Sequence, residues 1–232
     1  MNRSLLLPFL LFPALLAPGA ENLISNSSFE LKDADYGVTG FLHPWESDSF
    51  QGVSQDATTA VHGKYSICLV NRKGEQQRFM LREVRLKPDR SYTFSIWLKS
   101  DTGKVPVSVQ LRSVYRERMK PGAPQRWFSP SRTFLAEEEW KRCSFTFRSS
   151  PPPHEFYFPV LTLAAEGRIH LDGVQLEEGE SATEYAPSRA LECAMVPLQE
   201  VFTEGEDVRI ALRAANAGKE KKEWKGEVIA VK

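Results

Sequence analysis

Short segments in which apolar and polar residues alternate recur from Asn22 onward, and Gly, Pro, Asp and Asn residues separate them. A period of two is typical of a β-strand with one buried face, and no segment keeps a helical period. The pattern predicts strands over residues 23–30, 66–71, 77–86, 91–100, 105–114, 142–148, 156–163 and 168–177. An all-β fold is therefore expected.

Alternation also predicts which side chains face outward. In SYTFSIWLKS, residues 91–100, the even-numbered Tyr, Phe, Ile and Leu share the core face, and Trp97 lies on the opposite face among polar residues. In VPVSVQLRS, from residue 105, the valines and the leucine point inward, while Gln110 and Arg112 point outward. If these two strands are adjacent in one sheet, the three outward residues form a ligand platform.

The charge balance limits the class of partner. Lys plus Arg number 30 and Asp plus Glu number 30. A chain without net charge has no overall field to attract nucleic acid or an anionic membrane. A neutral or sugar-like partner is favoured, and nucleic acid is not expected.

The first residues, MNRSLLLPFLLFPALLAPGA, have the layout of a secretory signal: Arg3, then an apolar run, then small residues. Cleavage is expected after Gly19. The apolar run is too short to span a bilayer, so no membrane span is expected. An uncleaved anchor is the alternative. The mature protein is expected to be secreted, extracellular or periplasmic.

Composition changes again after residue 190. Val208, Ile210 and Leu212 alternate, which is typical of the opening strands of a second, immunoglobulin-like β-sandwich. About forty residues remain, fewer than the ~100 of such a sandwich. We therefore expect a signal peptide at 1–19, a first sandwich at 20–190, and at 191–232 the start of a second domain that continues in a longer parent.

The three cysteines are Cys68, Cys143 and Cys193, and none forms a CxxC spacing that would indicate a zinc knuckle or redox motif. Cys68 and Cys143 lie in predicted strands. They either pair, if those strands are neighbours, or remain buried thiols.

Several segments, taken in order, resemble the carbohydrate-binding modules of the cellulase C type, families four, nine and twenty-two. They are NLISNSSFE (22–30), Trp45, HGKYSICL (62–69), LKPDRSYTFSIWLKS (86–100), EEEWKRCSFTF (137–147) and GRIHLDGVQLEEGESATEYAPS (167–188). The likeness covers residues 22–188. It implies a galactose-binding-like jelly roll: two antiparallel sheets and one concave face.

The resemblance also implies a structural Ca²⁺ where the first and last strands meet. Glu30 and Asp172 match positions of oxygen ligands, and backbone carbonyls near His62 to Lys64 would complete the set. The alternative for Asp172 is a strand-end hydrogen bond without metal.

The resemblance further implies that aromatic rings stack on the sugar and that polar side chains contact its hydroxyl groups. The matching positions are Trp97, Gln110 and Arg112 on the concave face, with Trp45 and Trp127 in segments that would rim the groove.

No catalytic constellation is expected in the chain. It contains no GxSxG, HExxH or P-loop motif. Glu177 and Glu178 are strand neighbours that point to opposite faces, so they cannot form the carboxyl pair of a glycosidase; with Glu180 they are interpreted as the solvated end of a strand. The scattered histidines, His43, His62, His154 and His170, are interpreted as turn or surface residues.

The sequence therefore predicts a noncatalytic module that binds a polysaccharide or oligosaccharide and forms the leading part of a larger glycan-active protein. The alternative is a structural β-sandwich scaffold or protein-interaction domain without a sugar ligand.

Overall fold

The computed structural model describes residues 21–31, 52–73, 75–114, 128–151, 156–189, 191–197 and 210–216, and the elements in these ranges are β-strands. The strands are β1 (Val53–Asp56), β2 (Ser66–Asn71), β3 (Gln77–Met80), β4 (Val84–Arg85), β5 (Ser91–Ser100), β6 (Val105–Val114), β7 (Ser131–Ala136), β8 (Lys141–Arg148), β9 (Phe156–Leu163), β10 (Gly167–Glu178), β11 (Leu191–Pro197) and β12 (Ile210–Asn216).

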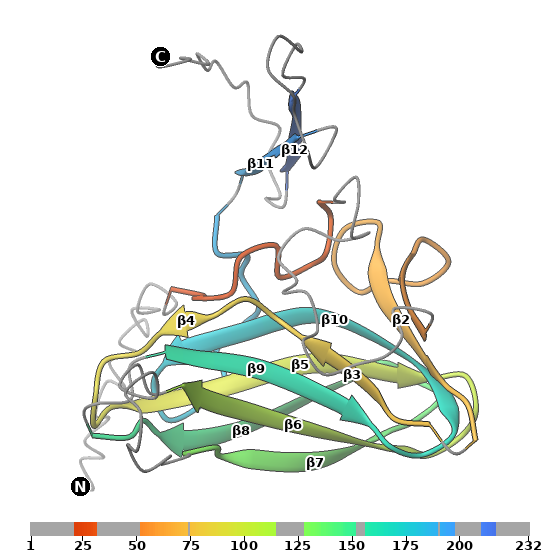
Figure 1. Ribbon diagram of the computed structural model, residues 1–232, viewed down its shortest axis with the longest axis horizontal. Coiled ribbons are helices and arrows are strands. Elements are labelled where there is room, and N and C mark those ends of the chain that lie inside the picture. Colours follow the sequence, from red (N-terminus) through yellow and green to blue (C-terminus); the bar gives the residue numbers. More distant parts are fainter. Residues whose placement is uncertain are drawn as a thin grey trace, which may run out of the picture.

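The first ten strands form two antiparallel sheets that stack on each other (Figure 1). One sheet has the order β1-β2-β10-β5-β8 and is called the β10 sheet below. The other has the order β3-β9-β6-β7, with β4 also paired to β9, and is called the β9 sheet. The predicted all-β sandwich is confirmed.

The core lies between the sheets, and alternation predicts its members correctly. Phe94, Ile96 and Leu98 of β5 are fully buried, as are Val107 and Val109 of β6. These residues belong to one continuous apolar cluster to which both sheets contribute. Burial of each large side chain contributes about 1.5–3 kcal/mol, so the cluster is the main source of stability.

The segment predicted as a first strand, residues 23–30, is not a strand. Leu23 donates a backbone hydrogen bond to Leu176, but a turn follows at once over residues 25–28. Asn26 and Phe29 have positive φ angles of 48° and 59°. Asparagine tolerates this conformation, and the Asn26 side chain fixes it by bonding both the N–H and the carbonyl of Leu31.

Other boundaries also differ from the prediction. The predicted strand 77–86 is divided into β3 and β4, and the sequence pattern missed β1 and β7 altogether. β1 has the sequence VSQD, with one apolar residue, and β7 is an edge strand whose side chains are mostly exposed. Neither gives the alternation on which the prediction depended.

β11 and β12 form a separate two-stranded antiparallel sheet. Ile210 and Leu212 lie on β12 as predicted strand residues, and Val208 lies outside the described residues. The completion of a second sandwich stays a prediction. Among the described residues, no helix is long and apolar enough to cross a membrane.

Cys68 and Cys143 are free buried thiols, not a disulfide. Cys68 lies on β2 and Cys143 on β8, with β10 and β5 between these strands. Cys143 is opposite Ile96 and joins the core, whereas Cys68 is opposite His170 and faces away from it. Of the two alternatives, the buried thiols are correct.

Candidate functional site

The predicted platform of Trp97, Gln110 and Arg112 is wrong, because these residues lie on different sheets. Trp97 is on β5 in the β10 sheet, whereas Gln110 and Arg112 are on β6 in the β9 sheet. The turn at residues 101–104 carries the chain from one layer to the other instead of forming a hairpin within a sheet. The outward faces of the two strands therefore point away from each other.

Trp97 is half-buried and contacts a neighbouring ring. The His62 ring meets it edge-on at 6.1 Å and stacks on Tyr185 at 4.0 Å. A Cβ atom at Gly173 would lie 2.9 Å from Trp97 Cδ1, which shows how closely the β10 backbone approaches the indole. Tyr185 belongs to residues 179–189, called the strap below. Trp97 therefore contacts the strap's neighbour His62, and its predicted role in ligand binding stays a prediction.

Glu177 anchors the strap, and its interpretation as a solvated residue is wrong. Its side chain is fully buried and accepts hydrogen bonds from the Thr183 N–H at 2.9 Å, the Thr183 hydroxyl at 2.6 Å and Gln175 Nε2 at 2.8 Å. Glu178 points the other way, with 43% of its side chain exposed, and pairs with Lys87. The predicted opposite orientation of the two acids is confirmed.

The outer face of the β9 sheet, called the β9 face below, combines aromatic, apolar and polar side chains. Arg112 lies opposite Phe158, and Gln110 lies opposite Val160. The register adds Phe156 on β9, with Met80 and Arg78 on β3. Val160 is 3% exposed although it is outside the core cluster. This face therefore holds the two predicted polar residues and two phenylalanines in one patch.

Phe156 and Phe158 were missed by the sequence analysis. In FYFPVLTL they alternate with Tyr157, which is fully buried in the core. The guanidinium of Arg85 lies 5.8 Å from the centre of the Phe156 ring, a cation–π contact on the same face. The alternation was itself the available signal, since it places both rings on the side opposite the core. Trp45 and Trp127 lie outside the described residues and stay predictions.

Glu30 and Asp172 bind the same loop. Asp172 Oδ2 accepts hydrogen bonds from the N–H groups of Val61 and His62 at 2.7 and 2.8 Å. Glu30 Oε1 accepts from the N–H groups of Lys64 and Tyr65 at 2.9 and 3.0 Å. The expected approach of the chain's first segment to β10 is therefore present.

Gly63 is the residue that lets both acids reach this loop. Its φ is +74°, and a Cβ atom there would meet the Glu30 carboxylate at contact distances no side chain tolerates. The two N–H groups that precede Gly63 in the sequence therefore bind Asp172, and the two that follow it bind Glu30.

Burial raises the pKa of Asp172 to about 7. Hydrogen bonds from the N–H groups of His62, Val61 and Gly173 oppose this effect, and the nearby charge of Glu30 adds to it. The side chain is fully buried. A cation placed between the two carboxylates would favour the ionised form.

These features define a β-sandwich module in which two acids hold a loop and a strap, and in which the β9 face carries half-buried rings and polar groups. The chain belongs to the Carbohydrate binding domain family of the CBM 4/9 type, whose model matches residues 21–162. The resemblance seen in the sequence is confirmed, and the chain is a carbohydrate-binding module.

Solved structures show the same fold. The CBM22-1 xylan-binding domain from Paenibacillus barcinonensis Xyn10C is 16% identical to this chain, with a TM-score of 0.50. The match covers 72% of this chain and 99% of that domain. The CBM22-1–CBM22-2 tandem of the same protein is 17% identical, with a TM-score of 0.50. That match covers 79% of this chain and 52% of the tandem. A Family 16 carbohydrate binding module is 22% identical, with a TM-score of 0.46 over 68% and 100%. Comparison with curated proteins gives no match.

Proposed function

We propose that this chain is a noncatalytic module that binds a neutral glycan on the β9 face. The observation that carries the proposal is the placement of Phe158 beside Arg112 and of Phe156 on the same strand, with Gln110 two register positions from Arg112 on the same face. On the opposite face the strap binds the buried Glu177, and the His62 ring, which contacts Trp97, stacks on Tyr185 of the strap.

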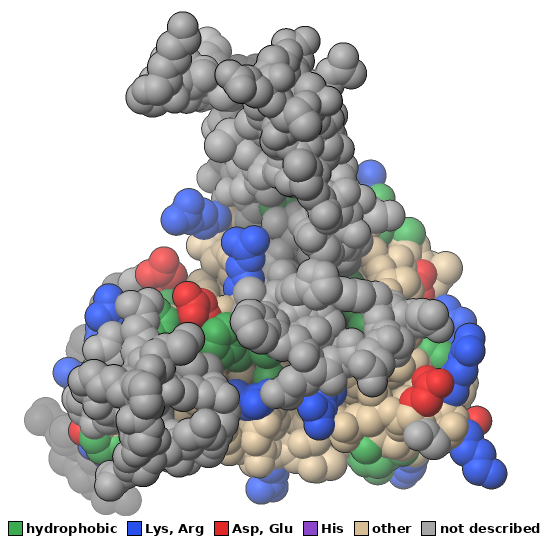
Figure 2. All heavy atoms as spheres, viewed as in Figure 1, with side chains coloured by type: hydrophobic (Ala, Val, Ile, Leu, Met, Phe, Trp, Pro, Cys, Tyr) green, Lys and Arg blue, Asp and Glu red, His purple; other side chains and the backbone are tan. Residues whose placement is uncertain are grey.

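The residue types on the β9 face suit a sugar. The two faces of a pyranose ring are rich in C–H groups and stack on aromatic rings, whereas its equatorial hydroxyls need donors and acceptors. Phe156 and Phe158 supply rings, Gln110 supplies an amide that both donates and accepts, and Arg112 supplies a fork of donors. The chain carries 30 basic and 30 acidic residues, which favours a neutral ligand over a polyanion, and Figure 2 shows both kinds of side chain on the face in view.

The proposal includes secretion and a longer parent protein. The first twenty residues support export, and the β11–β12 pair supports a further β-domain after residue 190. The structural use of Asp172 and Glu177 supports a noncatalytic role, because each carboxylate is occupied in holding backbone N–H groups.

We also propose that Glu30 and Asp172 hold a structural Ca²⁺, as the family resemblance implies. The donor set fits, since Ca²⁺ takes carboxylate and carbonyl oxygens, and two neighbouring acids, one fully buried, need a compensating charge. The Lys64 N–H already donates to Glu30. Any contribution from residues 62–64 would therefore come from their carbonyls. The ion would neutralise the two acids and fasten residues 22–31 to β10.

The free energy of unfolding of the calcium-free protein should depend on pH through the titration of Asp172. Because the folded pKa lies above the unfolded value of 3.8, the folded state binds the proton more tightly. The stability of the wild type relative to that of Asp172→Asn should be largest below about pH 4. It should decline by up to about 4 kcal/mol as the pH rises to 7.

Urea unfolding of both proteins in chelator, from pH 4 to pH 8, measures this difference. Added Ca²⁺ should raise the stability of the wild type most above pH 7, where Asp172 is ionised, and should not raise that of Asp172→Asn. Parallel pH profiles for the two proteins, or equal calcium responses, would contradict this account of Asp172.

Glycan binding is tested by affinity electrophoresis in gels that contain soluble xylan, mixed-linkage β-glucan or galactan. The wild type should be retarded by at least one of them. Phe158→Ala and Arg112→Ala should each weaken binding by about 1–2 kcal/mol, which is roughly tenfold or more.

Arg148→Ala is the matched control, because Arg148 is an exposed arginine on the opposite sheet and pairs weakly with Asp89 at 3.8 Å. It should bind as the wild type does. No retardation by any polysaccharide would favour the scaffold alternative, and equal loss in Arg148→Ala would reject the β9 face as the site.

A further inference from the structure

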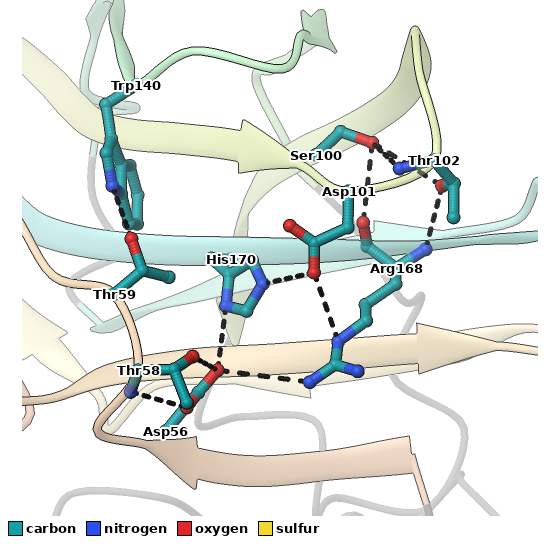
Figure 3. Close-up of polar contacts among 9 residues, drawn as sticks. All are labelled: Asp56, Thr58, Thr59, Ser100, Asp101, Thr102, Trp140, Arg168 and His170. Carbon is teal, nitrogen blue, oxygen red and sulfur yellow. Dashed lines mark hydrogen bonds and ion pairs between the residues drawn. The ribbon is translucent and has the colours of Figure 1, made fainter.

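The outer face of the β10 sheet carries a second cluster of side chains, remote from the β9 face. It is centred on His170, which was interpreted as a surface residue but is 1% exposed. Its neighbours are Asp56 on β1, Asp101 after β5 and Cys68 on β2, directly opposite His170 (Figure 3 shows all but the cysteine). Glycan binding on the β9 face uses none of these groups.

The hydrogen bond between His170 and Asp101 indicates which ring nitrogen carries the proton when the ring is neutral. Nε2 lies 2.8 Å from Asp101 Oδ2. Because an ionised carboxylate can only accept, Nε2 donates, and in the neutral ring Nδ1 then holds a lone pair. Among the described residues Nδ1 has no hydrogen-bond partner, although it is buried. A neutral imidazole whose far N–H is held by a carboxylate is the usual state of a metal-binding histidine.

The lone pair of Nδ1 points toward two further donor atoms. Asp56 Oδ2 lies 3.2 Å away, without the geometry of a hydrogen bond. Cys68 Sγ completes a group of three donor atoms that all lie within 4.8 Å of one another. Tetrahedral Zn²⁺ with bonds of about 2.0–2.3 Å separates its ligand atoms by roughly 3.3–3.8 Å, so the cluster needs only a small contraction.

The charges around the cluster also match a divalent cation. The carboxylates of Asp56 and Asp101 and the thiolate of Cys68 would together carry three negative charges. Arg168, whose Nη2 is 4.0 Å from Asp56 Oδ2 and whose Nε is 3.3 Å from Asp101 Oδ2, carries one positive charge. A bound M²⁺ brings the sum to zero.

We propose that Asp56, Cys68 and His170 form a Zn²⁺ site with an open fourth position, and that Asp101 is the positioning residue that holds the His170 ring. Nitrogen, sulfur and one carboxylate oxygen are the donor types that Zn²⁺ prefers, whereas Ca²⁺ takes oxygen alone. The side chains of Asp101 and Arg168 are 38% and 49% exposed, so the ion has a short path from solvent.

Binding of Zn²⁺ should release the proton of the Cys68 thiol. Burial raises the pKa of the Cys68 thiol, although Arg168 counteracts this, so the metal-free thiol keeps its proton at neutral pH. Zn²⁺ replaces that proton on Sγ, and one proton leaves to solvent for each ion bound. Affinity should therefore rise with pH.

The test uses the purified chain without a polyhistidine tag, in reducing buffer saturated with Ca²⁺. Titration with Co²⁺, a spectroscopic substitute for Zn²⁺, should give the thiolate-to-metal absorption band and the visible bands of a tetrahedral ion. Both should saturate at one equivalent, and Zn²⁺ should displace them. Absence of the thiolate band in the wild type would overturn the proposal without recourse to any variant.

Variants then identify the ligands. Cys68→Ser should abolish the thiolate band, and His170→Gln should weaken Zn²⁺ binding at least 100-fold. Asp101→Asn, which leaves all three ligands in place, should weaken it about 10- to 100-fold. Cys143→Ser is the matched control, since Cys143 is the other described buried thiol and lies in the core; it should leave the band unchanged.

Two results would reject the site even if metal binds. A band that survives Cys68→Ser but is lost in Cys143→Ser or Cys193→Ser would place the metal on another thiol. Weak binding of several equivalents that is unaffected by His170→Gln would indicate adventitious surface binding. Neither result depends on glycan binding, so this proposal and the proposed function can fail separately.

Discussion

Replacement of Asp172 by alanine is expected to lower the free energy of unfolding by about 3–5 kcal/mol. The carboxylate accepts N–H groups from Val61, His62 and Gly173, and each donor left without an acceptor costs about 1–3 kcal/mol. Because the pKa of Asp172 is about 7, the side chain is mostly protonated at pH 6, and relief of repulsion from Glu30 offsets little of this loss. The loop around Gly63 would lose its attachment to β10.

Urea unfolding at pH 6 in chelator measures the change without any contribution from calcium. Asp172→Asn should lose less, because its amide oxygen can still accept from Val61 and His62. If Asp172→Ala were within 1 kcal/mol of the wild type, the hydrogen bonds to the loop would not be the structural role of this acid.

Replacement of Glu177 by alanine should have the second largest effect on stability, about 2–4 kcal/mol. Its loss leaves the Thr183 N–H and hydroxyl and the Gln175 amide without their acceptor. It also removes a negative charge that helps to hold Arg142 in its half-buried position. The strap should detach from the β10 sheet.

Glu178→Ala is a matched control one residue away. Glu178 is exposed and makes only a surface ion pair with Lys87, which is worth about 0–1 kcal/mol. Thermal unfolding and limited proteolysis of the two variants should differ clearly, with cleavage within residues 179–189 only in Glu177→Ala. Similar behaviour of both variants would mean that the strap does not depend on Glu177.

The strands could be predicted from the sequence because alternation is a local property. β2, β5, β6 and β9 have the predicted bounds, and in each of them one face is apolar. The segment 23–30 was also predicted as a strand, but the side-chain bonds of Asn26 to Leu31 hold it in a turn. A pattern of hydrophobicity contains no information about such bonds.

The candidate site was predicted less well, because the assignment of strands to sheets is a long-range property. Trp97 and Gln110 lie on consecutive strands, which are neighbours in many antiparallel sheets, yet here β5 and β6 belong to different layers. Gln110 and Arg112 were placed on an outward face correctly. Phe156 and Phe158 joined them only when the pairing of β6 with β9 was known.

The His170 cluster shows the same limit. Asp56, Cys68 and His170 have no ligand spacing along the chain. They meet because β1, β2 and β10 are consecutive in the sheet and because the register places Cys68 opposite His170. A metal motif built from three strands cannot be recognised from sequence separation.

The central claim, that the β9 face binds the glycan, is tested most directly by NMR titration of the chain with an oligosaccharide of whichever polysaccharide retards it. The account predicts saturable shifts in the amide resonances of Gln110, Arg112, Phe156 and Phe158, with Trp97 and His170 unchanged. Shifts confined to Trp97, the strap and the β10 sheet would contradict it.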